Sequence, residues 1–201
     1  MSAPEPWYVP WPQMPALPAL GAVVLVRVAG NLPRPAARQG ARVVLRHILA
    51  AWSGPAVGSQ VLNETARGPV WSGELAGHSL DISLAYTESA AWIGLRRGGA
   101  IGVDAMTVAA IPEAVAVAKI YLGPEAWTMI QGAADPVRAF AEAWTALEAR
   151  LKCRKLALTE WPANQDPAGG SGLVVRHYTD QDQNQAVCVV TEGGTEKIVS
   201  K

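Results

Sequence analysis

The sequence predicts an α+β fold made of two similar halves. Short β-branched or alternating segments predict strands, while longer segments carry apolar residues at the spacing of an amphipathic helix. A strand–turn–strand pattern at 80–95 recurs at 173–190, each time after a helix and an irregular connection. This echo predicts two α/β halves related by pseudo-twofold symmetry, with an active-site cleft between them, since ligands commonly bind in such clefts.

The first half, residues 1–105, is expected to contain one helix among several strands. After a proline-rich lead, β-branched residues predict a strand at 22–28. Helical spacing predicts a helix over 35–52, and a glycine-rich connection then runs to about residue 77. Alternation and a Gly98-Gly99 turn predict three further strands, at 80–86, 91–95 and 100–104.

The second half, residues 106–201, is expected to be helical first and then to form strands. Helical segments are predicted over 112–122 and 123–129. The main helix begins at Asp135, a good N-cap, followed by Pro136 at the first helical position. Two strands close the half, at 173–178 and 186–190. The apolar stripe predicted for the main helix consists of Val137, Phe140, Ala141, Trp144, Leu147 and Leu151.

The composition argues against nucleic acid and membrane partners. Among 201 residues, 17 Lys and Arg balance 17 Asp and Glu, so no global field attracts a polyanion or an anionic bilayer. No apolar segment reaches the roughly 18 residues that span a membrane, and the N-terminus lacks the order of a signal peptide. The only cysteines, Cys153 and Cys188, suit reduced thiols. We expect a cytoplasmic protein.

Two acidic motifs are the candidate site. Asp104 ends a predicted strand and points away from the face shared by Ile101 and Val103. Glu148 and Lys152 lie four residues apart, hence on one face of the main helix. Oxygen ligands of this kind hold a divalent cation against phosphate. Taken singly, the helical pair also fits an exposed salt bridge, and Asp104 also fits a turn cap.

The order of these motifs resembles the 4'-phosphopantetheinyl transferase superfamily, in its surfactin-synthetase-activating type. That family is marked by Gly-Ile/Val-Asp on a strand and, further along, by Trp-Ser/Thr-x-Lys-Glu-Ala/Ser-x-x-Lys. The corresponding segments are Gly102-Val103-Asp104 and Trp144-Thr-Ala-Leu-Glu-Ala-Arg-Leu-Lys152. More loosely, the resemblance extends from the helix around Arg38 to the strand 186–190, and it therefore covers most of the chain.

The resemblance implies an enzyme, a holo-[acyl-carrier-protein] synthase. Such enzymes transfer the phosphopantetheine arm of coenzyme A to a serine of an acyl or peptidyl carrier protein, in fatty acid, polyketide or nonribosomal peptide biosynthesis, and release 3',5'-ADP. By resemblance, Asp104 and Glu148 would ligate Mg²⁺. Glu148 and Lys152 would be catalytic: Glu148 or a metal-bound water takes the serine proton, and Lys152 stabilises or protonates the leaving phosphate.

The resemblance also suggests residues that bind coenzyme A. Arg38 and Arg42 would grip its 3'-phosphate through their planar guanidinium groups, although a solvated helix edge is the plainer interpretation of either arginine. Arg67, in Arg67-Gly68-Pro69, echoes the family's Gly-Lys/Arg-Pro element. Tyr86 and Thr87 end the strand that in the family carries a phosphate-contacting histidine. Lys152 would contact the same phosphates.

Three departures from the family pattern keep a second hypothesis open. Met106 stands where the family usually has a third acidic metal contact, Leu147 replaces a lysine, and Tyr86 replaces the histidine. They favour a catalytically degenerate relative that binds coenzyme A or a carrier protein as an interaction module. Under either hypothesis each chain supplies both halves of the site, so we expect a monomer.

Overall fold

A computed structural model describes residues 7–10, 12, 23–29, 33–53, 62–65, 68–75, 77–161, 172–180 and 184–193. Within these residues the protein is a mixed α+β fold of four α-helices, one π-helical turn and three sheets, which confirms the predicted class. The helical elements are α1 (Arg34–Ser53), α2 (Ala114–Val117), η1 (Ala118–Leu122), α3 (Pro124–Gly132) and α4 (Pro136–Arg154).

The three sheets contain five, three and two strands among the described residues. The largest has the order β1-β2-β7-β6-β5, comprising β1 (Trp7–Pro10), β2 (Val23–Ala29), β7 (Ala90–Arg97), β6 (His78–Tyr86) and β5 (Glu74–Leu75). In this sheet β1 lies parallel to β2, and all the other neighbouring strands are antiparallel to each other. The second sheet is antiparallel and has the order β8 (Ile101–Thr107), β10 (Gln185–Glu192), β9 (Leu173–Asp180). β3 (Leu62–Thr65) and β4 (Gly68–Trp71) form an antiparallel hairpin.

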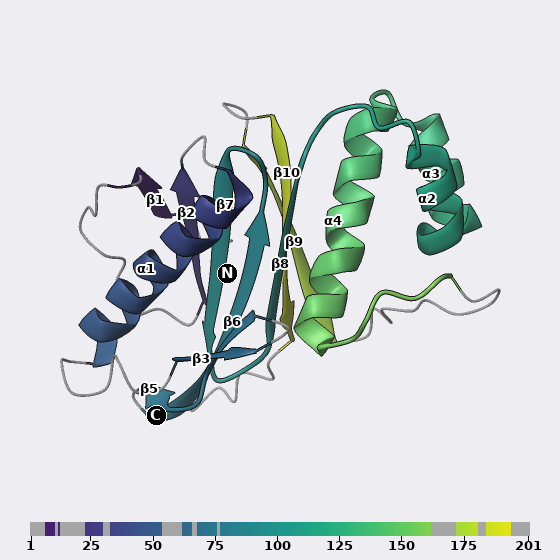
Figure 1. The fold of residues 1–201 in the computed structure, drawn as a ribbon. Helices are drawn as coiled ribbons and strands as arrows, with labels where there is room; N and C mark the ends of the chain where they lie inside the picture. The colour runs from purple at the N-terminus through teal and green to yellow at the C-terminus, as the bar shows by residue number, and fades with distance from the viewer. Residues whose placement is uncertain are drawn as a thin grey trace, which may run out of the picture.

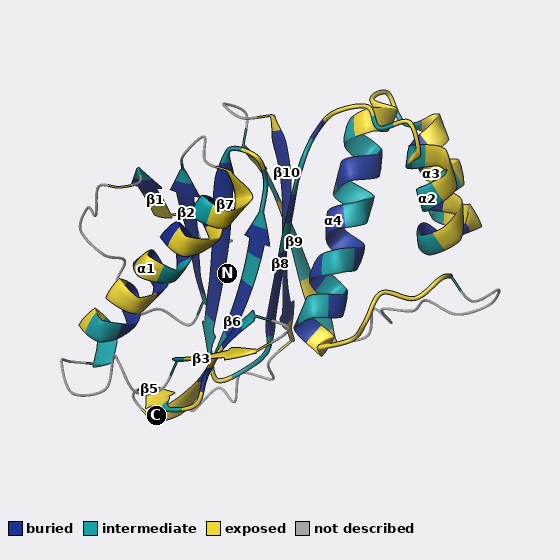
Figure 2. Cartoon of the chain, viewed as in Figure 1, coloured by how far each residue is buried: buried dark blue, intermediate teal, exposed yellow. Residues whose placement is uncertain are grey.

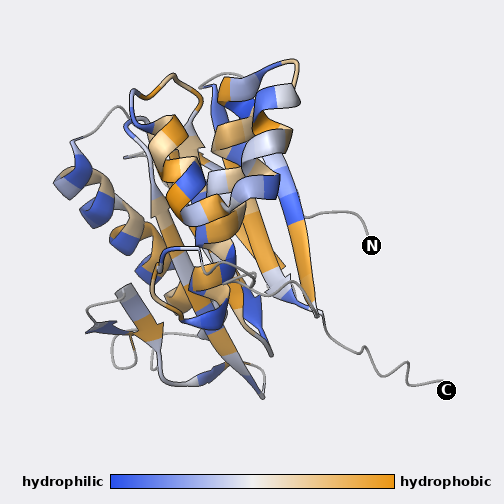
Figure 3. Ribbon diagram, turned by 90° about the vertical axis from the view of Figure 1, so that its right-hand side faces the viewer, coloured by the Kyte–Doolittle hydropathy of each residue, from blue (hydrophilic) through white to orange (hydrophobic). Residues whose placement is uncertain are grey.

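The elements stack in layers (Figure 1). α1 covers one face of the five-stranded sheet, and the three-stranded sheet lies beyond its other face. α4 covers the outer face of the three-stranded sheet, with α2, η1 and α3 outside it. The strands behind these helices are hydrophobic along much of their length (Figure 3), as strands buried between layers should be. No described helix is long and apolar enough to cross a membrane.

Separate apolar clusters hold the layers together. Val44, Leu45 and Ile48 of α1 are fully buried against the five-stranded sheet. Between the two sheets, Trp92 packs with Ile101 and other apolar residues. Figure 2 shows the consequence: α1 is buried on one side only, whereas α4 carries buried residues on both of its packed sides. α4 is therefore a central helix, not a surface helix.

The main helix begins where the sequence predicts. The side chain of Asp135 accepts a hydrogen bond from the amide of Arg138 at 3.0 Å, and Pro136 occupies the first turn. The stripe prediction is wrong at one position, because Val137 is exposed. It is also too narrow: Ala146, Ala149 and Cys153 are buried against β10, on a face of α4 that the stripe omitted.

The sequence prediction missed β1, β3, β4 and β5, all of which are short. The boundary predicted between the halves, after residue 105, falls inside β8. β8 pairs along its length with β10, so Asp104 lies opposite Cys188 in the three-stranded sheet.

Candidate functional site

Gly102 lets α4 lie directly against β8. A Cβ atom at this position would collide with the carbonyl oxygen of Ala149 and would lie 2.5 Å from the amide nitrogen of Cys153. Only a residue without a side chain permits this approach. Because Gly102 and Asp104 are two residues apart on one strand, they share a face. The glycine therefore brings the face of β8 that carries Asp104 up to the turns of α4 that carry Glu148 and Lys152.

Lys152 pairs with Asp104 across this contact. The Lys152 Nζ lies 2.7 Å from Asp104 Oδ1, and the Asp104 side chain is only 14% exposed. Nζ also donates to the carbonyl oxygens of Val103 at 3.1 Å and Leu84 at 3.3 Å. An ammonium group has three N–H donors, so all of them are engaged.

Glu148 lies one helical turn before Lys152, and the charges of Asp104 and Lys152 both affect its pKa. Burial is the first cause that raises its pKa, and the negative charge of Asp104 raises it further, while Lys152 opposes both effects. Burial likewise raises the pKa of Asp104, against the attraction of Lys152. Among the described residues, Glu148 has no hydrogen-bond or ion-pair partner. Two carboxylates thus repel each other with one ammonium to balance them.

This donor set fits Mg²⁺, although it is sparse. Within the described part of the chain, no group of three or more His, Cys, Asp or Glu side chains is arranged to hold a metal ion. Mg²⁺ does not require one, since it usually keeps several waters and binds through one or two carboxylates and substrate phosphates. Asp104 and Glu148 supply two such carboxylates, and a cation beside them would relieve the repulsion that raises the pKa of Glu148.

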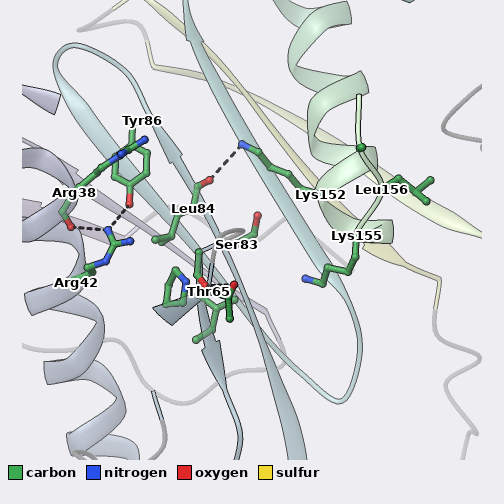
Figure 4. Close-up of a pocket in the computed structure, with 13 residues that line it drawn as sticks. Arg38, Arg42, Thr65, Ser83, Leu84, Tyr86, Lys152, Lys155 and Leu156 are labelled. Atoms are coloured by element: carbon green, nitrogen blue, oxygen red, sulfur yellow. Dashed lines mark hydrogen bonds between the residues drawn. The ribbon is translucent and has the colours of Figure 1, made fainter. Parts of the chain in front are cut away.

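A cavity of about 550 Å³ opens beside the Asp104–Lys152 pair. Figure 4 shows its two walls: Arg38, Arg42 and Tyr86 stand on one side, while Lys152 and Lys155 reach in from the end of α4 on the other. The floor includes Ser83 and Leu84 of β6. Four basic side chains converge on one cavity, in a chain with no net charge. Such a local patch suits a polyanionic ligand.

Tyr86 is held between the two arginines of α1. Arg38 lies over its ring, with the guanidinium carbon 5.7 Å from the ring centre, a cation–π distance. Arg42 Nη1 donates to the Tyr86 hydroxyl at 3.3 Å. Burial raises the pKa of Tyr86, so the hydroxyl stays protonated near neutral pH. Its own hydrogen is therefore left to donate to a ligand oxygen.

Besides Lys152, two more of the basic side chains already have acidic partners. Arg42 makes a bidentate pair with Glu64 of β3, at 2.6 Å from Nε and 2.9 Å from Nη2. Lys155 Nζ lies 2.8 Å from both carboxylate oxygens of Asp81. Lys155 reaches this position because it ends α4 in a left-handed conformation, with φ 58°. A ligand anion would compete with both carboxylates.

The structure brings most, but not all, of the predicted site residues together. Arg38, Arg42, Tyr86 and Lys152 line the cavity, and Asp104 and Glu148 adjoin Lys152. Thr87 lines a neighbouring cavity instead, and its hydroxyl bonds to the carbonyl of Ala90 and accepts from Gln185. Arg67 lies outside the described residues.

The three departures from the family pattern have different surroundings. Leu147 is buried among the apolar residues of η1 and α3, on the side of α4 away from the three-stranded sheet. Met106 shares the face of β8 with Asp104 but packs against apolar neighbours. Tyr86 alone lines the basic cavity. Of the three departures, Tyr86 is thus the one that lines the candidate ligand cavity.

Several residues at the site were not predicted from the sequence. Glu64 lies in a segment expected to be irregular. Ser83 and Asp81 belong to the site because their side chains accept hydrogen bonds from backbone amides of β8. Lys155 follows Arg150 and Arg154 at the basic end of α4, and this cluster of positive charge is the sequence signal that points to it.

Part of the chain is similar to a known protein family. The sequence model of the 4'-phosphopantetheinyl transferase superfamily matches residues 100–194. The matched segment contains Asp104, Glu148 and Lys152, whereas α1 and Tyr86 precede it. No curated protein matches the chain. The similarity to the 4'-phosphopantetheinyl transferase superfamily thus lies in residues 100–194, which include β8, α4 and β10.

Proposed function

We propose that this protein transfers 4'-phosphopantetheine from coenzyme A to a serine of an acyl or peptidyl carrier protein, with Mg²⁺, as a holo-[acyl-carrier-protein] synthase of the surfactin-synthetase-activating type. One observation carries the proposal. Lys152, which pairs with Asp104 and lies one helical turn after Glu148, lines a cavity whose other wall is Arg38, Arg42 and Tyr86. Phosphate chemistry needs both a cation site and a basic cradle, and this cavity has candidates for each.

Coenzyme A carries its charge at two places, a pyrophosphate and a 3'-phosphate, and the basic residues lie on two walls. We assign the 3'-phosphate to Arg38, with the Tyr86 hydroxyl as a second donor. Arg42 adjoins them but is paired with Glu64, so it contributes fully only if that pair opens. The pyrophosphate then faces Lys152 and Lys155 on the α4 side of the cavity.

Asp104 and Glu148 would hold Mg²⁺, which neutralises charge on the phosphoanhydride as it breaks. Glu148 would accept the proton of the attacking serine as a general base. Lys152 holds a proton at Nζ and can present it to the leaving phosphate once its bond to Asp104 is exchanged. Losing one such interaction typically costs about 3 kcal/mol of transition-state stabilisation.

The remaining predictions complete the proposal. The two halves, 1–105 and 106–201, are proposed to be related by a pseudo-twofold axis, with coenzyme A between them. The substrate carrier protein would approach the open side of this cleft. We also propose a cytoplasmic monomer, since one chain contains both walls of the cavity.

The test is incubation of the full chain with coenzyme A, Mg²⁺ and a panel of apo carrier proteins, followed by intact mass of each carrier. A gain equal to one phosphopantetheine, absent when Mg²⁺ is removed with EDTA, supports the proposal. Calorimetric titration with coenzyme A runs in parallel. Binding of coenzyme A without transfer to any carrier would reject the enzyme and leave a binding module.

The second candidate, a degenerate relative that binds without catalysis, is favoured by a specific observation. All three donors of Lys152 are occupied, and Arg42 is neutralised by Glu64. A true binding module keeps these contacts when coenzyme A enters. The two candidates therefore differ in transfer: an enzyme transfers the arm to a carrier and loses this activity when Glu148 is replaced by Gln, whereas a module binds coenzyme A without transfer before and after the replacement.

A further inference from the structure

The two large sheets meet along β6 and β8 without a backbone ladder. β8 pairs with β10 on one side. In an antiparallel pair, every second residue turns its N–H and C=O away from the partner strand. Ile101 and Val103 are such residues, because their amides donate to side chains of β6. Both are fully buried, so water cannot satisfy them.

Side-chain oxygens of β6 satisfy these amides in register. Asp81 Oδ2 accepts from Ile101 N at 2.8 Å, and Ser83 Oγ accepts from Val103 N at 2.9 Å. The donors and the acceptors are each two residues apart, which is the repeat of one strand face. We call these four residues, Asp81, Ser83, Ile101 and Val103, the β6–β8 seam. These two hydrogen bonds fix the position of β8 along β6.

The two lysines of α4 close the seam from the helix side (Figure 4). Lys152 Nζ donates to Leu84 O of β6 and to Val103 O of β8, so one ammonium bridges both strands. Lys155 pairs with Asp81, whose second role is to accept from Ile101. β6, β8 and α4 are thus tied at a single place, and the next residue of β8 is Asp104.

We propose that Ser83 is a positioning residue for the candidate catalytic centre. Ser83 is 6% exposed, and its hydroxyl holds the amide of Val103, immediately before Asp104. Lys152 Nζ in turn donates hydrogen bonds both to the carbonyl oxygen of Val103 and to the carboxylate of Asp104. A shift of β8 against β6 would move Asp104 relative to Lys152 and Glu148. The inference rests on the proposed function, because it assigns Ser83 a part in that reaction without contact to the reacting atoms.

The rival explanation is that Ser83 only stabilises the fold. The two explanations separate in the kinetics. A displacement of about 1 Å in a catalytic group lowers kcat by up to roughly a hundredfold. Ground-state binding of coenzyme A is largely kept, because its 3'-phosphate is assigned to Arg38 and Tyr86 on the opposite wall of the cavity. A purely structural residue would change the folded fraction, and with it the apparent enzyme concentration, but not kcat per folded molecule.

The experiment compares Ser83→Ala, Ser83→Thr and Ser79→Ala in the full chain, with carrier mass gain giving kcat and KM, normalised to the folded fraction. Ser83→Thr keeps a hydroxyl on the same strand. Ser79→Ala makes the same atomic change at an exposed site of β6. We expect Ser83→Ala to lower kcat by about ten- to a hundredfold, with KM for coenzyme A within about twofold. Ser83→Thr should recover most of kcat, and Ser79→Ala should match the wild type.

Wild-type kcat in Ser83→Ala overturns the inference, as does loss of kcat that Ser83→Thr fails to recover. A wild type without transfer to any carrier overturns the proposed function instead. The inference is then decided by titration with Mn²⁺ alone, read by electron paramagnetic resonance. It predicts weaker Mn²⁺ binding in Ser83→Ala than in Ser79→Ala. Equal affinity, or no binding by the wild type, rejects it.

Discussion

Lys152 Nζ lies 2.7 Å from Asp104 Oδ1, and this pair joins the last turn of α4 to the middle of β8. The aspartate is mostly buried, so its charge depends on the lysine. The lysine in turn gives its remaining donors to backbone carbonyls of two strands. A single pair therefore couples the candidate metal site to the packing of both sheets.

Removing the ammonium should expose this coupling. Lys152→Met keeps most of the side-chain volume but leaves Asp104 buried without its cation, and we expect a loss of about 2–3 kcal/mol in the free energy of unfolding. Asp104→Asn should cost less, and the double variant should be more stable than the sum of the two losses predicts. Urea denaturation of the four proteins measures this cycle. Strict additivity would show that the pair makes no energetic contribution.

Glu148 should destabilise the metal-free protein at neutral pH. Folding raises its pKa through burial and the charge of Asp104. A carboxyl with a raised folded pKa favours the folded state in its protonated form. The associated stability is present below the unfolded pKa, roughly 4.3, and is lost as pH rises through the folded pKa. Glu148→Gln should therefore raise the thermal midpoint at pH 7 in EDTA.

The pH dependence is the control for this prediction. Below about pH 4, where Glu148 is protonated in both states, the midpoints of the wild type and Glu148→Gln should converge. Glu142→Gln on the same helix provides the matched comparison, because Glu142 lies among the residues of a different cavity. A lower midpoint for Glu148→Gln at pH 7 would contradict the repulsion that we assign to Asp104.

Gly102 should tolerate no side chain. A Cβ would meet the backbone of α4 at Ala149 and Cys153, and helix backbone cannot yield as a flexible side chain can. We expect Gly102→Ala to lower stability by about 1–3 kcal/mol through overpacking and to reduce transfer by displacing α4. Gly132→Ala, at the end of α3 with nothing within 4 Å of its added Cβ, is the control and should be neutral or slightly stabilising. Equal stability of the two variants would show that α4 does not need this close approach.

Arg38 should distinguish coenzyme A from dephospho-coenzyme A. Charge-assisted hydrogen bonds contribute about 1.5–3 kcal/mol, so Arg38→Ala should weaken coenzyme A binding by about tenfold or more. Dephospho-coenzyme A, which lacks the 3'-phosphate, should bind the two proteins within about twofold of each other. Arg46→Ala removes an exposed arginine two turns further along α1, outside the cavity, and serves as the control. Equal loss for both ligands in Arg38→Ala would place the 3'-phosphate elsewhere.

The sequence predicts elements well where the signals are local. Asp135 and Pro136 give the start of α4, and two-residue alternation gives β6, because each signal acts within one element. The alternation of a strand also placed Asp104 on the correct face of β8, away from Ile101 and Val103. Short strands are not predicted in this way. β1 has only four residues and ends in proline, and it forms because it pairs with the parallel strand β2.

Contacts between distant segments could not be predicted in this way. The Gly98-Gly99 turn suggests that β8 continues beside β7, yet β8 pairs with β10, far along the chain. Ser83 and Glu64 belong to the site through partners in other elements, and no local pattern marks such partners. The chemistry of a side chain is visible in the sequence, but the backbone amide that it will satisfy is set by the packed sheets.

The most direct test of the account is the mass of an apo carrier protein after incubation with coenzyme A and Mg²⁺ in the presence of the wild type, Glu148→Gln or Glu142→Gln. The proposed function predicts a gain of one phosphopantetheine with the wild type and with Glu142→Gln, and none with Glu148→Gln although it still binds coenzyme A. Transfer that survives Glu148→Gln at the wild-type rate would contradict the central role given to the Asp104–Glu148–Lys152 site.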